Sequence, residues 1–109
     1  SAEYALAALN SPLLVVMGHS SCGAVGGALT LNDSAAFPDR LQALLADIQT
    51  TLREEGAAEG DIATAVSANV DAQVEAVRAI PLVAEKEAAG ELRVVGAVYD
   101  LATGEVTFK

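Results

Sequence analysis

The sequence predicts an α/β fold in which helices flank a parallel sheet that ends in an antiparallel edge strand. Leu13 to Met17 is a continuous apolar run of strand length, which is typical of a strand buried on both faces. Leu92 to Leu101 is rich in Val with a central glycine and predicts a second core strand. The helical segments between them are long enough to connect parallel strands. The 109 residues suffice for a single domain, 1–109, and 52% of them are hydrophobic with few aromatics, so we expect a core of Ala, Val and Leu.

The chain begins with a segment, Ser1 to Leu9, that we expect to be the end of a helix. Asn10-Ser11-Pro12 stops this helix and turns the chain into the first strand. Four residues share one stripe of the helix: Tyr4, Ala5, Ala8 and Leu9. The simplest interpretation of Tyr4 is therefore a core aromatic side chain. After the strand, a helix is expected to start near Cys22 and to end at Asn32-Asp33-Ser34.

Two amphipathic helices are expected in the middle of the chain. The first begins at Phe37-Pro38-Asp39, and the second at Asp61, a candidate N-cap. A polar loop, Glu54 to Gly60, connects them. Their apolar stripes are Leu41, Leu44, Leu45, Ile48 and Leu52, and then Ile62, Val66, Val70, Val74 and Val77. Both stripes predict core packing.

The last third of the chain returns to the sheet. Pro81 breaks the preceding helix, and a short helix follows that ends at Gly90, a suitable C′ residue. Asp100 to Gly104 is predicted to be a hairpin turn into an edge strand, Glu105 to Phe108. Three strands make a thin sheet for this many helices, so we expect further strands from upstream or from a partner chain.

The turn after the first strand carries the only histidine, His19, and the only cysteine, Cys22. Open α/β sheets bind ligands at the carboxyl ends of their strands, and zinc accepts both an imidazole and a thiolate. A zinc site needs at least one more protein ligand, which the chain has no other His or Cys to supply. Two other interpretations stay open: Cys22 as a small buried hydrophobic residue, and His19 as a cap of the turn.

Several stretches together resemble a known family. Gly18-His19-Ser20-Ser21-Cys22-Gly23, preceded by Ser1-Ala2-Glu3-Tyr4-Ala5, resembles the zinc-binding core of the β-class carbonic anhydrases. Further stretches match in the same order: Asn69-Val70-Asp71-Ala72-Gln73-Val74, Val95-Gly96-Ala97-Val98-Tyr99-Asp100 and Thr103-Gly104-Glu105-Val106. The resemblance spans nearly the whole chain. It implies a β-carbonic-anhydrase-like sheet that is incomplete in these residues.

The resemblance implies zinc as cofactor, with His19 and Cys22 as metal ligands. The family takes its third ligand from a cysteine in an upstream Cys-x-Asp-Ser-Arg motif, whose Asp and Arg form a pair beside the metal. That motif is absent from the sequence, so the chain resembles the carboxyl-terminal part of a family member. No residue is therefore assigned a catalytic role with certainty.

Other polar groups are expected around the turn. Backbone N–H groups at the helix start, that of Gly23 among them, could face a bound anion, since a helix start favours negative charge. Close packing of the helix on the sheet is the other interpretation of Gly23, Gly26 and Gly27. The amides of Asn69 and Gln73 could hydrogen-bond the metal-site loop or a neighbouring chain, and the match places Tyr4 near the site.

The implied function is zinc-dependent, reversible hydration of carbon dioxide to bicarbonate and a proton, by a homodimer or higher even oligomer. Two alternatives stay open: a zinc hydrolase of carbonyl sulfide or carbon disulfide on the same scaffold, and a metal-free oligomerising remnant. Six basic against fifteen acidic residues give a net charge of −9 and no basic run, which disfavours nucleic acid and anionic membranes as partners. No apolar run is long enough to span a bilayer, and we expect a cytoplasmic protein.

Overall fold

The computed structural model describes residues 1–30 and 38–109. The elements follow in the order α1 (Ala2–Ala8), β1 (Leu13–His19), α2 (Gly23–Thr30), α3 (Asp39–Glu54), α4 (Ile62–Arg78), α5 (Pro81–Ala88), β2 (Arg93–Tyr99) and β3 (Val106–Phe108). The predicted end of the second helix at Asn32-Asp33-Ser34, and the Phe37 position of the next helix start, lie outside the described residues.

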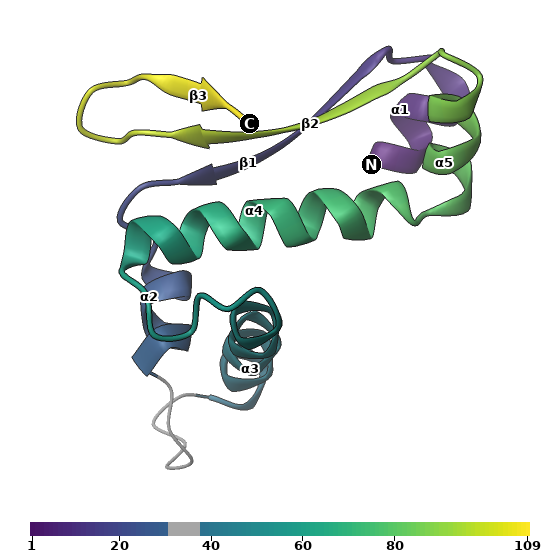
Figure 1. Cartoon of the computed structure of the whole chain (residues 1–109). Helices are drawn as coiled ribbons and strands as arrows, with labels where there is room; N and C mark the ends of the chain where they lie inside the picture. The colour runs from purple at the N-terminus through teal and green to yellow at the C-terminus, as the bar shows by residue number, and fades with distance from the viewer. Residues whose placement is uncertain (31–37) are drawn as a thin grey trace.

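The predicted sheet is confirmed. β1 and β2 pair in parallel, and β3 pairs with β2 in the antiparallel direction, so the strand order is β1-β2-β3. Helix α4 runs along the strands, with α2 and α3 at one end of it and α1 and α5 at the other (Figure 1). The α/β class with a parallel pair and an antiparallel edge strand is therefore the observed architecture.

Two glycines let α4 lie close to the sheet. A Cβ atom at Gly18 of β1 would come within 2.6 Å of Val70 Cγ2, and one at Gly96 of β2 within 2.9 Å of Val70 Cγ1. Both distances are shorter than real Cβ contacts allow. Because Val70 is only 3% exposed, it has little room to move away. The helix and both strands are thus held together at the positions that lead to the carboxyl end of β1.

The core consists of two groups of buried side chains, one at each end of α4. The first group joins α2, α3 and the start of α4: Val25, Ala28, Leu45, Leu52, Ala57, Ala65 and Val66. The second joins the rest of α4 to the strands, α1 and α5: Leu6, Val70, Val74, Val83, Leu92 and Val94. Val98 packs against both groups. These aliphatic side chains confirm the expected Ala, Val and Leu core.

Three local predictions are confirmed by the caps and turns. The Asp61 side chain accepts a hydrogen bond from the Thr64 backbone N–H at 2.7 Å and caps α4. Gly90 follows α5 with φ +74°, and the N–H groups of Gly90 and Glu91 donate to carbonyls of the last turn, as in a Schellman motif. Gly104 has φ +76° in the turn before β3.

Some side chains predicted to be core are exposed. In α1 the buried residue is Leu6, whereas Tyr4 and Leu9 are 66% and 63% exposed. In α3 the short neighbour α2 covers Leu45, while Leu41 and Leu44 remain 40% and 51% exposed. The first residue of the α4 stripe, Ile62, is 41% exposed, because it lies at the end of the helix.

The sheet face turned away from α4 carries several exposed apolar side chains. Side chains alternate along a strand, so the residues of β1 two positions apart share a face. Leu13 and Met17 of β1 are 51% and 53% exposed, and Val106 and Phe108 of β3 are 41% and 64% exposed. In the described part of the chain these apolar side chains remain in contact with solvent.

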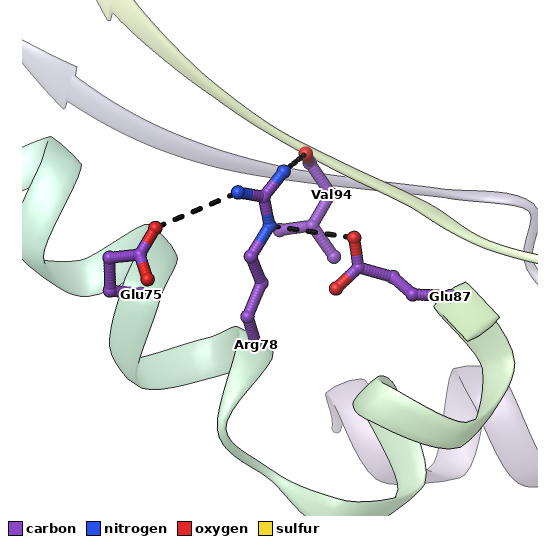
Figure 2. A network of polar contacts seen from close by, with 4 residues as sticks. All are labelled: Glu75, Arg78, Glu87 and Val94. Atoms are coloured by element: carbon purple, nitrogen blue, oxygen red, sulfur yellow. Dashed lines mark hydrogen bonds and ion pairs between the residues drawn. The ribbon is translucent and has the colours of Figure 1, made fainter.

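The amino ends of the strands are joined to the helices by Arg78. Its guanidinium donates to the Val94 carbonyl at 3.2 Å and forms ion pairs with Glu75 at 3.6 Å and Glu87 at 3.4 Å (Figure 2). One side chain therefore connects α4, α5 and β2.

Candidate metal centre

His19 is the last residue of β1, two residues beyond the predicted end of the strand. It is exposed and lies in register with Tyr99 of β2. Its Nδ1 atom is 2.9 Å from the backbone carbonyl oxygen of Ser20. Since a carbonyl oxygen only accepts, Nδ1 is the nitrogen that carries the proton. In the neutral ring the lone pair then lies on Nε2, which is available to a metal ion.

Ser20 is tied to β2 and to the turn that follows it. Its backbone N–H donates to the Tyr99 carbonyl at 2.9 Å, which extends the β1–β2 ladder by one step. Its Oγ atom accepts a hydrogen bond from the Leu101 backbone N–H, also at 2.9 Å. No local pattern in the sequence indicates this bond of Ser20, because Leu101 lies 81 positions further along the chain.

Cys22 follows directly after the tight part of the turn. Ser21 has a left-handed φ of +53°, which redirects the chain from β1 into α2. Cys22 is half-buried and packs against the buried group of α2, α3 and α4. Its carbonyl accepts the Gly26 N–H and begins the helix. The turn thus places an imidazole and a thiol at the carboxyl end of the same strand.

The three glycines of α2 have different surroundings. A Cβ atom at Gly26 would lie 3.4 Å from Ile62 Cδ1, and one at Gly27 would lie 3.4 Å from Leu45 Cδ2. For these two, close packing is the interpretation that the contacts favour. Gly23 is exposed and has no heavy atom within 4 Å of a Cβ position. It is the first residue of α2, where backbone N–H groups have no partner inside the helix.

A mostly apolar hollow of about 380 Å³ adjoins the turn. It is lined by residues of the turn, of the start of α2 and of the start of α4: Ser20, Ser21, Cys22, Gly23, Gly26, Gly27, Ile62 and Ala63. Space for a small uncharged molecule therefore lies next to the candidate ligand Cys22.

The described residues do not complete a metal site by themselves. Within residues 1–30 and 38–109, no group of three or more His, Cys, Asp or Glu side chains could hold a metal ion. In the described sheet β1 is an edge strand, paired only with β2. The His19 and Cys22 donors suit zinc chemically, and the open edge of β1 lies beside them.

Asn69, Gln73 and Tyr4 were also expected near the site. Asn69 Oδ1 is buried and accepts no hydrogen bond from the described part of the chain, while Gln73 is exposed. The predicted bonds from these amides to the metal-site loop are therefore not formed by the described residues. Tyr4 lies on α1, at the opposite end of the molecule from the β1–α2 turn (Figure 1).

Similarity to known proteins identifies the family and the class of fold. The sequence model of the carbonic anhydrase family matches residues 1–106. The chain is 38% identical to a carbonic anhydrase of Synechococcus elongatus over 112 aligned residues, which cover 97% of this chain and 41% of the relative. The chain therefore belongs to the carbonic anhydrase family.

Solved structures place the chain in the β class. It superposes on the β-carbonic anhydrase CcaA with a TM-score of 0.85 and 29% identity, covering 98% of this chain and 55% of that one. A tetrameric β-carbonic anhydrase of Sordaria macrospora gives a TM-score of 0.80 at 26% identity, covering 98% and 56%. The chain spans about half the length of the curated relatives it matches.

No helix in the described part of the chain has the length and apolar character needed to cross a membrane.

Proposed function

We propose that the protein to which this chain belongs catalyses the reversible hydration of carbon dioxide to bicarbonate and a proton with zinc as cofactor. The observation that carries the proposal is the position of His19 and Cys22. They occupy the turn after a parallel strand, in a chain that the carbonic anhydrase family matches over residues 1–106. The Nδ1 hydrogen bond of His19 leaves Nε2 free to bind a metal.

In this proposal His19 Nε2 and the Cys22 thiolate would hold the zinc ion. Bound zinc supplies a Lewis acid that lowers the pKa of water and so makes a nucleophile available near neutral pH. The chain contributes the orientation of the imidazole through Ser20 and of the thiol through the packing of Cys22.

The surroundings of the turn suit both substrate and product. Carbon dioxide is small and uncharged, and the apolar hollow beside Cys22 has room for such a molecule. Bicarbonate is an anion, and the exposed start of α2 at Gly23 would offer it N–H groups that have no partner inside the helix.

The third protein ligand is proposed to come from a strand that pairs with the open edge of β1. Parallel strands end at the same edge of a sheet, so the residue that ends such a strand would lie beside His19. The upstream Cys-x-Asp-Ser-Arg motif implied by the family resemblance suits this position. Residues 1–109 alone are therefore expected to bind zinc weakly and to have little hydratase activity.

We also propose a homodimer or a higher even oligomer. The exposed apolar face of the sheet and the tetrameric relative from Sordaria macrospora support it. A single domain over 1–109 and a cytoplasmic location stay predictions.

The test is carbon dioxide hydration by the intact gene product, followed by stopped-flow spectroscopy, together with zinc content per chain. The variants His19→Ala and Cys22→Ser are expected to lose most of the zinc and the activity. Thr103→Val serves as the control, because Thr103 lies in the turn before β3 and its hydroxyl accepts the Glu105 N–H of the same hairpin.

Two results would contradict the proposal. One is full zinc content and activity in both ligand variants. The other is turnover of carbonyl sulfide or carbon disulfide without turnover of carbon dioxide, which would indicate the alternative hydrolase.

A further inference from the structure

Ser20 links the end of β1 to a hairpin that lies far away in the sequence. Three of its groups are engaged, each at 2.9 Å: the N–H donates to the Tyr99 carbonyl, Oγ accepts from the Leu101 N–H, and the carbonyl accepts from His19 Nδ1. Of these three groups of Ser20, only the hydroxyl belongs to the side chain. A substitution can therefore remove it while the two backbone hydrogen bonds remain possible.

The hairpin gives Leu101 a fixed N–H direction. Asp100 donates its N–H to the Glu105 carbonyl and accepts the Gly104 N–H on its own carbonyl, both at 2.8 Å. Asp100 Oδ1 also accepts the Ala102 N–H at 2.8 Å. These bonds fix the residues that precede and follow Leu101 in the hairpin. The Leu101 N–H is thereby a rigid donor that restrains the side-chain torsion of Ser20.

The restraint matters for the histidine ring. A neutral histidine in water favours the tautomer with the proton on Nε2, which would leave no lone pair there for a metal. The Ser20 carbonyl stabilises the other tautomer because it can only accept a hydrogen bond. Its orientation depends on how the Ser20 backbone is held between β2 and the left-handed Ser21.

We propose that Ser20 is a positioning residue: through its hydroxyl it couples the Asp100–Gly104 hairpin to His19 and so keeps the imidazole proton on Nδ1 and Nε2 free for the metal. This role depends on the proposed function in one respect, namely that the metal ion bound by His19 is zinc. The tautomer of His19 is a property of the metal-free protein.

The tautomer is measured by NMR on the intact, zinc-free protein labelled with ¹⁵N-histidine, at a pH at which the imidazole is neutral. The His19 signal is assigned by its loss in a His19→Gln variant. The wild type is expected to show the Nδ1–H tautomer. Ser20→Ala should shift the population toward Nε2–H and weaken zinc binding, measured by competition with a chromophoric chelator, by about 10- to 100-fold.

Two variants control for general damage to the fold. Ser20→Thr keeps a hydroxyl acceptor and should retain the wild-type tautomer and zinc affinity. Thr103→Val removes the hydroxyl that accepts the Glu105 N–H at 3.3 Å, in the same hairpin but away from Ser20, and should also resemble the wild type.

Several results would overturn the role of Ser20. These are an Nε2–H ring in the wild type, an unchanged tautomer and zinc affinity in Ser20→Ala, or equal losses in Thr103→Val. If Ser20→Ala does not fold, the wild type and Ser20→Thr decide, because an Nε2–H ring in either contradicts the proposal. A protein that shows the expected tautomers and zinc affinities but does not hydrate carbon dioxide would overturn the proposed function and leave this role intact.

Discussion

The two ends of the β1–β2 pair are stabilised in different ways. At the amino end, buried side chains of α1 and α5 pack on the strands, with Leu6 and Val83 each 1% exposed, and Arg78 joins three elements. At the carboxyl end, His19 is exposed, and the turn after it is held by the backbone and hydroxyl hydrogen bonds of Ser20.

This difference explains why a chain can have a packed scaffold and an unfinished site. Packing requires only apolar neighbours, which the described residues supply at the amino end. A metal site requires donors that converge, and the described residues contribute two of them, His19 and Cys22, beside an open sheet edge. Substitutions at the two ends should therefore separate stability from zinc affinity.

The largest effect on stability is expected from Leu6→Ala at the amino end. Leu6 is 1% exposed, and truncation of a buried leucine costs about 2–5 kcal/mol of unfolding free energy. Urea unfolding of the intact protein measures the loss, while zinc content per folded chain should not change. Leu9→Ala is the matched control, because Leu9 is 63% exposed and should cost about 0.5 kcal/mol or less. A larger loss in Leu9→Ala than in Leu6→Ala would show that α1 packs through its other face.

Gly18→Ala should lower both the unfolding free energy and the zinc affinity, because Gly18 packs against α4 and directly precedes His19 on β1. The new methyl group would meet Val70 Cγ2 at 2.6 Å and Val66 Cγ1 at 3.0 Å, and such overpacking costs about 1–3 kcal/mol. If β1 shifts to relieve the contact, His19 shifts with it, so zinc affinity should fall together with stability. Gly23→Ala has free space around its Cβ position and should leave the unfolding free energy nearly unchanged. A Gly18→Ala protein with wild-type stability would mean that α4 lies further from the sheet.

Most of the scaffold could be predicted from the sequence because its signals are local. The apolar runs gave the two parallel strands, Asp61 indicated the start of α4, and Gly90 indicated the end of α5. The inward face of α1 could not be predicted, since a seven-residue helix is too short for its apolar period to choose between Leu6 and the Tyr4 stripe.

The site could be predicted less completely for a physical reason. The spacing of His19 and Cys22 identified two donors, but hydrogen bonds between distant segments leave no local pattern. The extension of β1 to His19 depends on the pairing of the strand with Tyr99, and the role of Ser20 depends on Leu101. Asn69 Oδ1 is buried and has no hydrogen-bond partner in the described residues. Apart from the family resemblance, nothing in the sequence indicates which group this atom contacts.

Arg78→Met tests the polar part of the amino end and should have a smaller effect. The Arg78 side chain is 44% exposed, so its two ion pairs are screened by solvent. The hydrogen bond to the Val94 carbonyl contributes most of the expected loss of about 1 kcal/mol. Arg78→Lys keeps the charge but lacks the planar guanidinium and should retain only part of that stability. Urea unfolding measures both variants. Loss of zinc in Arg78→Met at unchanged stability would contradict the separation of the two ends.

The smallest effect is expected at Asp61, whose cap lies at the same end of α4 as the candidate site. The backbone N–H of Thr64, and then its side chain, lower the pKa of Asp61 below its ordinary value of 3.8. Because the folded-state pKa is lowered, the stabilisation by the carboxylate is present above the ordinary pKa. It is lost as the pH falls through the lowered value.

Asp61→Asn isolates this charge, because an asparagine amide oxygen can still accept the Thr64 N–H and asparagine is a good N-cap. Thermal unfolding should give the wild type a slightly higher Tm at neutral pH, and the difference should vanish in acid. Effects of acid that do not involve residue 61 are common to both proteins, so they cancel from the difference. Asp61→Ala loses the cap itself and should have a lower Tm at every pH. A wild-type advantage that persists or grows in acid would show that the carboxylate does not stabilise the start of α4 by its charge.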